Sequence, residues 1–175
     1  MKYFSGFCLS NESELFDFWL DKCSDYCVAG FSYGAIKAVK YCLETQNRID
    51  RLILLSPAFF NDKDEKFKRS QLLYFKKNSK LYIKNFIKNI SNGSKIDLSK
   101  YITSSDYNQL KELLYYQWDI DKLNLLSKKG IKIEVILGEN DKIIDAKKAK
   151  DFFEKASIVY FIKNANHILK AKDEN

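Results

Sequence analysis

The chain has 175 residues, of which 46% are hydrophobic and 15% aromatic, and it carries a formal net charge of +7. This length and composition indicate one globular domain with a hydrophobic core and exclude a disordered chain. No apolar run is long enough to cross a bilayer, and residues 1–9 lack the apolar stretch of a signal peptide. We therefore expect a cytoplasmic protein that forms no stable association with membranes.

The cysteine and histidine content argues against a zinc site. The four cysteines show no paired C-x-x-C spacing, and the chain contains a single histidine. We therefore expect reduced thiols and predict neither a metal nor a cofactor.

The positive charge is concentrated in one segment. Residues 62–100 hold 11 basic and 4 acidic side chains, an excess equal to the net charge of the whole chain. Such a segment suggests a surface that binds a partner. Only three of the 30 basic residues are arginines. Because arginine is the residue that reads phosphates and guanines with paired hydrogen bonds, we expect no nucleic acid partner.

The first predicted element is a strand over residues 2–5, which ends at Gly6. Asn11 and Glu14 have the spacing of a helix capping box and predict a helix over 12–22. Residues 26–29 then have the apolar character of a short buried strand.

The next stretch is the sequence Gly30-Phe31-Ser32-Tyr33-Gly34, which has the pattern G-x-S-x-G. Apolar residues at helical spacing predict a helix over 33–46 directly after it. A strand, this pattern and a helix together are the context of a nucleophile elbow, in which glycines permit a sharp turn and the serine hydroxyl projects from the strand end. Ser32 is therefore the candidate nucleophile.

The remaining elements complete an α/β pattern. A lysine-rich, helical segment without clear strands is expected between the third and fourth strands. The predicted ranges are strand 51–56, which stops at Pro57, helical insert 61–127, strand 131–137, helix 145–155 and strand 157–162. About five strands joined by helices predict a mostly parallel sheet with right-handed crossovers. We therefore divide the chain into a core, residues 1–60 and 128–175, and a cap, residues 61–127.

A serine nucleophile needs a general base and an acid that orients the base. His167 is the only histidine and follows the last predicted strand. Asp141 lies in the sequence Gly-Glu-Asn-Asp at the end of the preceding strand, so the two side chains should meet at one edge of the sheet. Glu139 and Asp145 are the competing acids, although Asp145 is better placed to cap the next helix.

The chemistry also needs N–H donors for the tetrahedral oxyanion. The amide of Tyr33, directly after the nucleophile, is one candidate. The amide of Phe7 is the other, because Ser5-Gly6-Phe7 follows the first strand and Gly6 permits a turn there. Phe7 could equally be an ordinary loop aromatic.

From residue 1 to about 170 the chain resembles the α/β-hydrolases. The resemblance rests on the Gly30–Gly34 elbow, the acid loop at Asp141, the base loop Asn166-His167, Leu55-Ser56-Pro57-Ala58 after the next strand, and Ser5-Gly6-Phe7, where the family usually has His-Gly-x. It implies a Ser32–His167–Asp141 triad and an ester or acyl substrate. Within these residues we expect no counterpart of the family's first two strands, nor of the strand and helix that normally separate the oxyanion turn from the elbow. The expected fold is thus an abbreviated α/β-hydrolase fold with a helical cap.

In size, layout and basic insert the chain is most similar to the short, atypical pimeloyl-acyl carrier protein methyl ester esterases of bacterial biotin synthesis. This resemblance implies that the chain hydrolyses that methyl ester, releasing methanol. The same triad would serve a thioesterase or a short-chain esterase. A non-catalytic basic binding module and an esterase that acts at lipid surfaces are further alternatives.

A row of lysines in the insert could serve a carrier-dependent esterase. Lys76, Lys80, Lys84 and Lys88 recur every four residues and are expected on one face of a helix, with Tyr82, Ile83, Phe86, Ile87 and Ile90 opposite. This lysine row either binds the acidic acyl carrier protein or is a solvated helix face.

Overall fold

The computed structural model describes residues 1–171, and five strands within them form a single sheet. The strands lie in the order of the sequence, and every neighbouring pair is parallel: β1 (Lys2–Phe4), β2 (Cys27–Phe31), β3 (Arg51–Leu55), β4 (Lys132–Gly138) and β5 (Ile158–Ile162). The five-stranded parallel sheet predicted from the sequence is confirmed. The central strands β2 and β3 are almost wholly buried, as expected for strands covered on both faces.

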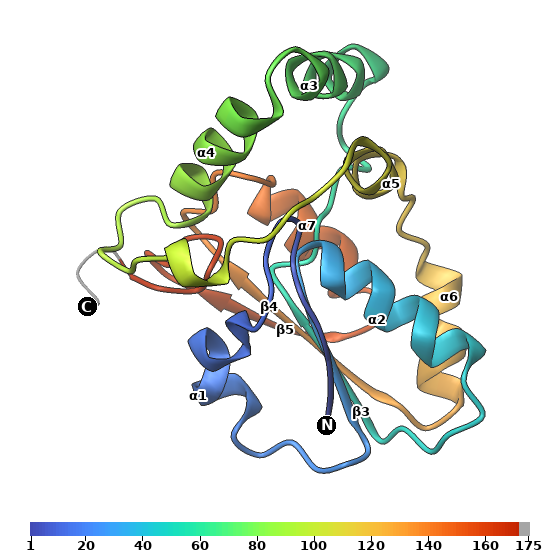
Figure 1. Ribbon diagram of the computed structural model, residues 1–175. Helices are drawn as coiled ribbons and strands as arrows, with labels where there is room; N and C mark the ends of the chain where they lie inside the picture. The colour runs from blue at the N-terminus through green and yellow to red at the C-terminus, as the bar shows by residue number, and fades with distance from the viewer. Residues whose placement is uncertain (172–175) are drawn as a thin grey trace.

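Helices cover both faces of the sheet (Figure 1). They are η1 (Glu12–Phe16), α1 (Asp17–Leu20), α2 (Tyr33–Glu44), α3 (Glu65–Lys77), α4 (Ser79–Ile90), η2 (Ser99–Tyr101), α5 (Tyr107–Tyr115), α6 (Ile120–Lys128) and α7 (Ala146–Phe153), where η denotes a 3-10 helix. Side chains alternate across a strand, so successive residues of β3 enter two different clusters. Leu52 belongs to the cluster that includes α2, α6 and α7, and Ile53 belongs to the cluster that includes η1 and α1.

The crossover from β1 to β2 departs from the prediction. The strands advance across the sheet in one direction, but η1 and α1 pack on one face and α2 packs on the other. Two crossovers that advance in the same direction on opposite faces must have opposite hands. The prediction of uniformly right-handed crossovers is therefore wrong for one of them. The β1–β2 link holds only η1 and one turn of α1, and the packing of Phe16 on Phe31, with ring centroids 4.8 Å apart, fixes its face.

The predicted capping box at Asn11 is also wrong. Asn11 adopts a left-handed conformation, with φ 60°, and its side chain caps nothing. Glu14 instead binds Lys100 Nζ at 2.6 Å and accepts a hydrogen bond from the Tyr101 hydroxyl. The segment after Asn11 thus begins as a 3-10 helix, and Glu14 connects it to Lys100 and Tyr101 of the insert.

The cysteines differ from the expectation of four reduced thiols. Cys23 and Cys27 are paired as a disulfide, whereas Cys8 and Cys42 are buried free thiols.

Residues 61–127 contain helices and no sheet strand, as predicted. Figure 1 shows α3 and α4 standing above one edge of the sheet, while α6 lies beside α2. Hydrogen bonds between Asn61 and Trp118 connect the beginning of this insert to a point near its end. Asn61 Nδ2 donates to the Trp118 carbonyl at 2.9 Å, and Trp118 N donates to Asn61 Oδ1 at 3.0 Å. The indole of Trp118 also donates to the Ala58 carbonyl at 2.8 Å, which anchors the pair to the core.

None of the helices within residues 1–171 combines the length and the apolarity that a bilayer span requires.

Candidate active site

The G-x-S-x-G sequence forms a sharp turn between β2 and α2. Ser32 has φ 53° and ψ −112°, a strained conformation for a residue with a side chain. The flanking glycines permit it, because the backbone on either side approaches too closely for a side chain. A Cβ at Gly30 would lie 2.3 Å from the Gly34 carbonyl oxygen, and one at Gly34 would lie 1.9 Å from the Phe4 carbonyl oxygen. The turn thus holds Ser32 at the carboxyl end of β2, against β1.

The structure brings Ser32, His167 and Asp141 together. His167 Nε2 lies 3.0 Å from Ser32 Oγ, and His167 Nδ1 lies 2.5 Å from Asp141 Oδ2. The Ser32 residue is 2% exposed, and the side chains of His167 and Asp141 are fully buried. The hydroxyl, imidazole and carboxylate therefore form one buried hydrogen-bond chain.

Asp141 is held by the loop that contains it. Its Oδ1 accepts hydrogen bonds from the backbone N–H groups of Ile143, at 2.7 Å, and Ile144, at 3.1 Å, which leaves Oδ2 for the imidazole. The two competing acids lie elsewhere. Glu139 accepts from the Asn164 amide, and Asp145 caps α7 by accepting from the Lys148 amide. Of the three acids, only Asp141 contacts the histidine.

The loop that carries His167 is fixed against the acid loop. Asn166 Oδ1 accepts from the backbone amides of Ile168 and Lys170, and its Nδ2 donates to the Asn92 carbonyl in the insert. Gly138, at the end of β4, lets the two loops approach: a Cβ there would lie 2.3 Å from the Asn166 carbonyl oxygen. These contacts set the position of the imidazole, which also packs on the Phe31 ring.

The backbone amides after β1 are nearly all used in hydrogen bonds. The amides of Gly6 and Cys8 donate to the side chains of Glu12 and Ser105, in that order. The amide of Leu9 donates to the Gly6 carbonyl, and that of Ser10 to the Tyr101 carbonyl. The amide of Phe7 donates to no group within residues 1–171. Tyr33 is the first residue of α2, where helix geometry leaves the N–H without an intrahelical acceptor. The two amides named as oxyanion donors thus have no helical or turn acceptor.

The Tyr33 side chain connects the elbow to the insert. Its hydroxyl donates to Glu112 of α5, and Lys40 of α2 binds the same carboxylate. Burial, followed by this hydrogen bond, raises the pKa of the Tyr33 phenol well above its ordinary value. Glu112 could not be predicted from the sequence, because it lies on a distant helix of ordinary amphipathic pattern.

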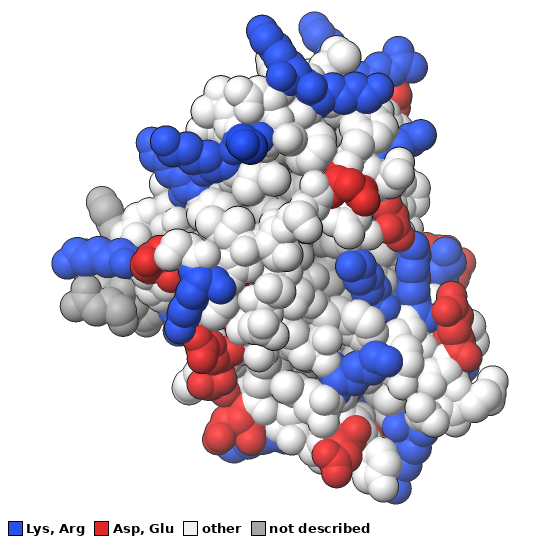
Figure 2. All heavy atoms as spheres, viewed as in Figure 1, with Lys and Arg blue, Asp and Glu red and all other residues white. Residues whose placement is uncertain are grey.

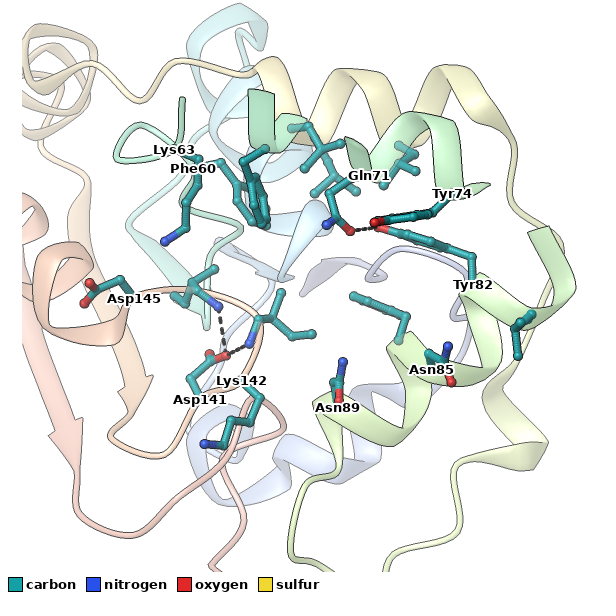
Figure 3. Close-up of a pocket in the computed structure, with 18 of the residues that line it drawn as sticks. Phe60, Lys63, Gln71, Tyr74, Tyr82, Asn85, Asn89, Asp141, Lys142 and Asp145 are labelled. Atoms are coloured by element: carbon teal, nitrogen blue, oxygen red, sulfur yellow. Dashed lines mark hydrogen bonds between the residues drawn. The ribbon is translucent and has the colours of Figure 1, made fainter. Parts of the chain in front are cut away.

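A pocket of about 900 Å³ lies between the insert and the acid loop. Figure 3 shows Gln71, Tyr82, Asn85 and Asn89 of α3 and α4 across this pocket from Asp141 and Lys142. Its apolar lining comes from Phe60, Phe67, Leu81, Phe86, Leu110, Leu113, Leu114, Ile143 and Ile144. The pocket thus combines an apolar wall with carboxamides and lysines.

The predicted lysine row is divided between two helices. Lys76 is in the last turn of α3 and lies over the Tyr107 ring, 4.5 Å from its centroid, whereas Lys80, Lys84 and Lys88 lie on α4. Asn78 separates the helices, so the prediction of one continuous row on one helix is wrong. All four lysines are exposed, and Figure 2 shows basic side chains over the part of the surface formed by α3 and α4. The apolar residues predicted opposite, from Tyr82 to Ile90, do pack against the core.

No protein-family model and no curated protein sequence matches the chain. Solved structures do match it. MenH from S. aureus is 16% identical, with a TM-score of 0.60 over 94% of this chain and 85% of that chain. The esterase EaEST from Exiguobacterium antarcticum is 14% identical, with a TM-score of 0.67 over 95% of this chain and 85% of that one. BioG from Haemophilus influenzae is 12% identical, with a TM-score of 0.59 over 95% of this chain and 87% of that one.

These matches cover nearly the whole chain, with TM-scores between 0.59 and 0.67. Together with the five parallel strands and the elbow between β2 and α2, they show that this chain has an abbreviated α/β-hydrolase fold.

Proposed function

We propose that this chain is a serine carboxylesterase in which Ser32, His167 and Asp141 form the catalytic triad. The supporting observation is the buried hydrogen-bond chain that joins them, with distances of 3.0 Å and 2.5 Å. Glu139 and Asp145 have other partners, and His167 is the only histidine in the chain. The solved esterases of the same fold support the same class of reaction.

The geometry accounts for both halves of ester hydrolysis. Ser32 Oγ attacks the ester carbonyl while His167 Nε2 takes the hydroxyl proton, and the same nitrogen then protonates the departing alcohol. Asp141 accepts the Nδ1–H bond, which fixes the tautomer and stabilises the imidazolium. A water molecule then gives its proton to Nε2 and attacks the acyl carbonyl, which releases the acid and restores the Ser32 hydroxyl.

The amides of Phe7 and Tyr33 would hold the oxyanion of the tetrahedral intermediate. Donors of this kind act where the negative charge develops and need no reorganisation during the reaction. Ser32 is buried, and the Phe86 ring of α4 packs edge-on against Phe7 with centroids 5.5 Å apart. Substrate entry therefore requires a movement of the side chains that cover Ser32, and Phe86 of the insert contacts the neighbouring Phe7.

The proposed substrate is the methyl ester of a pimeloyl-acyl carrier protein, in biotin synthesis. The sequence resemblance supports it, as does the fold shared with BioG. The apolar lining of the pocket suits the methylene chain of a pimeloyl group, and Lys77 and the carboxamides of Asn85 and Asn89 offer contacts for a polar carrier arm. The exposed lysines of α4 suit an acidic carrier protein.

A product assay tests the substrate. With the carrier-bound methyl ester, the purified chain should release methanol and leave the carrier thioester intact, so no free thiol should appear. Release of thiol without methanol would identify a thioesterase instead. An absence of turnover, together with no labelling of Ser32 by a fluorophosphonate, would favour a non-catalytic binding module.

Charge reversal on α4 tests the carrier. For the variant with both Lys80→Glu and Lys84→Glu, we expect kcat/KM for the carrier-bound ester to fall about tenfold at low salt, because opposite charges speed the encounter of two proteins. The loss should shrink at high salt, where such attraction is screened. Turnover of a small soluble ester should be unchanged.

The matched control reverses Lys122 and Lys128, which are exposed on α6 and do not line the pocket. This control should leave both substrates unaffected. An equal loss on the small ester and the carrier-bound ester in the α4 variant would contradict carrier binding by α4.

A further inference from the structure

A buried carboxylate lies beside the turn that follows β1. Glu12, the first residue of η1, is 0% exposed. Its Oε1 accepts hydrogen bonds from the Gly6 backbone N–H at 2.8 Å and from the Tyr3 hydroxyl at 3.2 Å. Its Oε2 is buried and has no hydrogen-bond partner within residues 1–171. Burying a carboxylate lowers stability, and the two hydrogen bonds to Oε1 offset part of that cost.

The hydrogen bond to Gly6 acts on the turn that carries the Phe7 amide. The Gly6 carbonyl accepts a hydrogen bond from the Leu9 amide at 3.3 Å. Because a trans peptide directs its C=O and N–H to opposite sides, this bond points the Phe7 N–H the other way. Glu12 fixes the preceding peptide through the Gly6 N–H. Two hydrogen bonds therefore set the orientation of the free Phe7 N–H: the one from the Leu9 amide to the Gly6 carbonyl, and the one from the Gly6 amide to Glu12.

We propose that Glu12 is a positioning residue that holds the Ser5-Gly6-Phe7 turn so that the Phe7 amide can bind the oxyanion. This role rests on the proposed esterase function. Glu12 does not touch the substrate, and it acts through the backbone of Gly6. A charged acceptor suits the task, because hydrogen bonds to a carboxylate are shorter and stronger than those to a neutral acceptor.

Two neighbouring titratable groups, Cys8 and Tyr3, lie close to Glu12. Burial, followed by the negative charge of Glu12, raises the pKa of the Cys8 thiol to about 12. The same two causes raise the pKa of the Tyr3 phenol well above its ordinary value. Tyr3 thus remains protonated and available as a donor to Glu12.

Three variants distinguish a role of Glu12 in positioning the turn from a role in the stability of the fold. Glu12→Asp shortens the side chain and should break the bond to Gly6, whereas Glu12→Gln keeps a carbonyl acceptor for it. Tyr3→Phe is the matched control, because it removes the other hydrogen bond to Glu12 and leaves Gly6 untouched. For a small ester we expect kcat of Glu12→Asp to fall about 10- to 100-fold with KM within a factor of about two, approaching the loss of one oxyanion donor. The Gln and Phe variants should keep kcat within a factor of about three.

Inhibition by a trifluoromethyl ketone, which forms an oxyanion adduct with a serine, measures binding of the oxyanion directly. A residue with a purely structural role would not affect this inhibition selectively. The inhibition constant of the ketone should rise in Glu12→Asp by the same factor as kcat/KM falls, and it should stay unchanged in Tyr3→Phe. If all three variants lose activity only in proportion to their loss of thermal stability, the proposal is overturned.

Hydrogen exchange of the Gly6 amide tests the same bond without any substrate. In folded Glu12→Asp this amide should exchange at least about tenfold faster than in the parent chain, because a hydrogen-bonded amide exchanges only when the bond opens. Glu12→Gln should keep its protection. Unchanged protection in the Asp variant would refute the positioning role even if the parent chain hydrolyses esters. An absence of all esterase activity in the parent chain would instead refute the proposed function.

Discussion

Replacement of Ser32 by alanine is expected to lower kcat for ester hydrolysis by about 10⁴- to 10⁶-fold, and His167→Ala should have an effect of the same order. The triad members act as a unit, since the hydroxyl is a weak nucleophile without the imidazole and the imidazole has no other nucleophile to activate. Both side chains are buried at the end of the sheet, and alanine fits both backbone positions no worse than the parent residue. The fold should therefore persist.

The measurement pairs turnover of a methyl ester with labelling by a fluorophosphonate and with circular dichroism as a check on folding. Ser56 provides the matched control. It is fully buried, follows the neighbouring strand β3, has φ 41° and leaves its Oγ without a hydrogen-bond partner within residues 1–171. Ser56→Ala should keep activity within a factor of about three, because the Ser56 hydroxyl forms no hydrogen bond to any member of the triad. Full turnover by Ser32→Ala, or labelling that depends on Ser56, would contradict the proposed nucleophile.

Replacement of Gly34 by alanine is expected to abolish folding or to lower the free energy of unfolding by more than about 4 kcal/mol. The added Cβ would lie 1.9 Å from the Phe4 carbonyl oxygen and 2.7 Å from that of Ser5, and both are backbone atoms that cannot rotate away. Relief would require separating the elbow from β1. In thermal unfolding this corresponds to a drop in Tm of about 10 °C or more for a chain of this size.

Gly130→Ala is the control for the Gly34 variant. Gly130 has φ +85° after α6, and a Cβ there would meet no atom within 4 Å. Its only cost is the left-handed backbone conformation, about 1–2 kcal/mol. A Gly34→Ala variant as stable as Gly130→Ala would show that β1 and the elbow are not packed as described.

The parts of the molecule that the sequence predicted are those with local signals. Each of these signals affects only the few residues around it. They are the glycines on either side of Ser32, the apolar runs of the strands, and Pro57 at the end of β3. His167 could be named because no other histidine competes with it.

The parts that the sequence could not predict depend on contacts between distant segments. The face on which η1 and α1 pack is decided by Phe16 meeting Phe31. The lysine spacing continues without interruption across Asn78, although the helix ends there, so periodicity alone could not reveal the break. Glu12 and Glu14 differ by two positions in a polar stretch, and only the fold shows that Glu12 is buried and Glu14 exposed.

The hydrogen bonds between Asn61 and Trp118 close the intervening segment into a loop whose two ends meet at one point of the core. A chain built in this way can lengthen, shorten or exchange the material between those two residues while β3, α6 and the strands beyond them stay in register. The surface that selects a substrate and the groups that would cleave it can therefore diverge at different rates during evolution. The same junction is the natural place to graft a foreign lid in protein engineering.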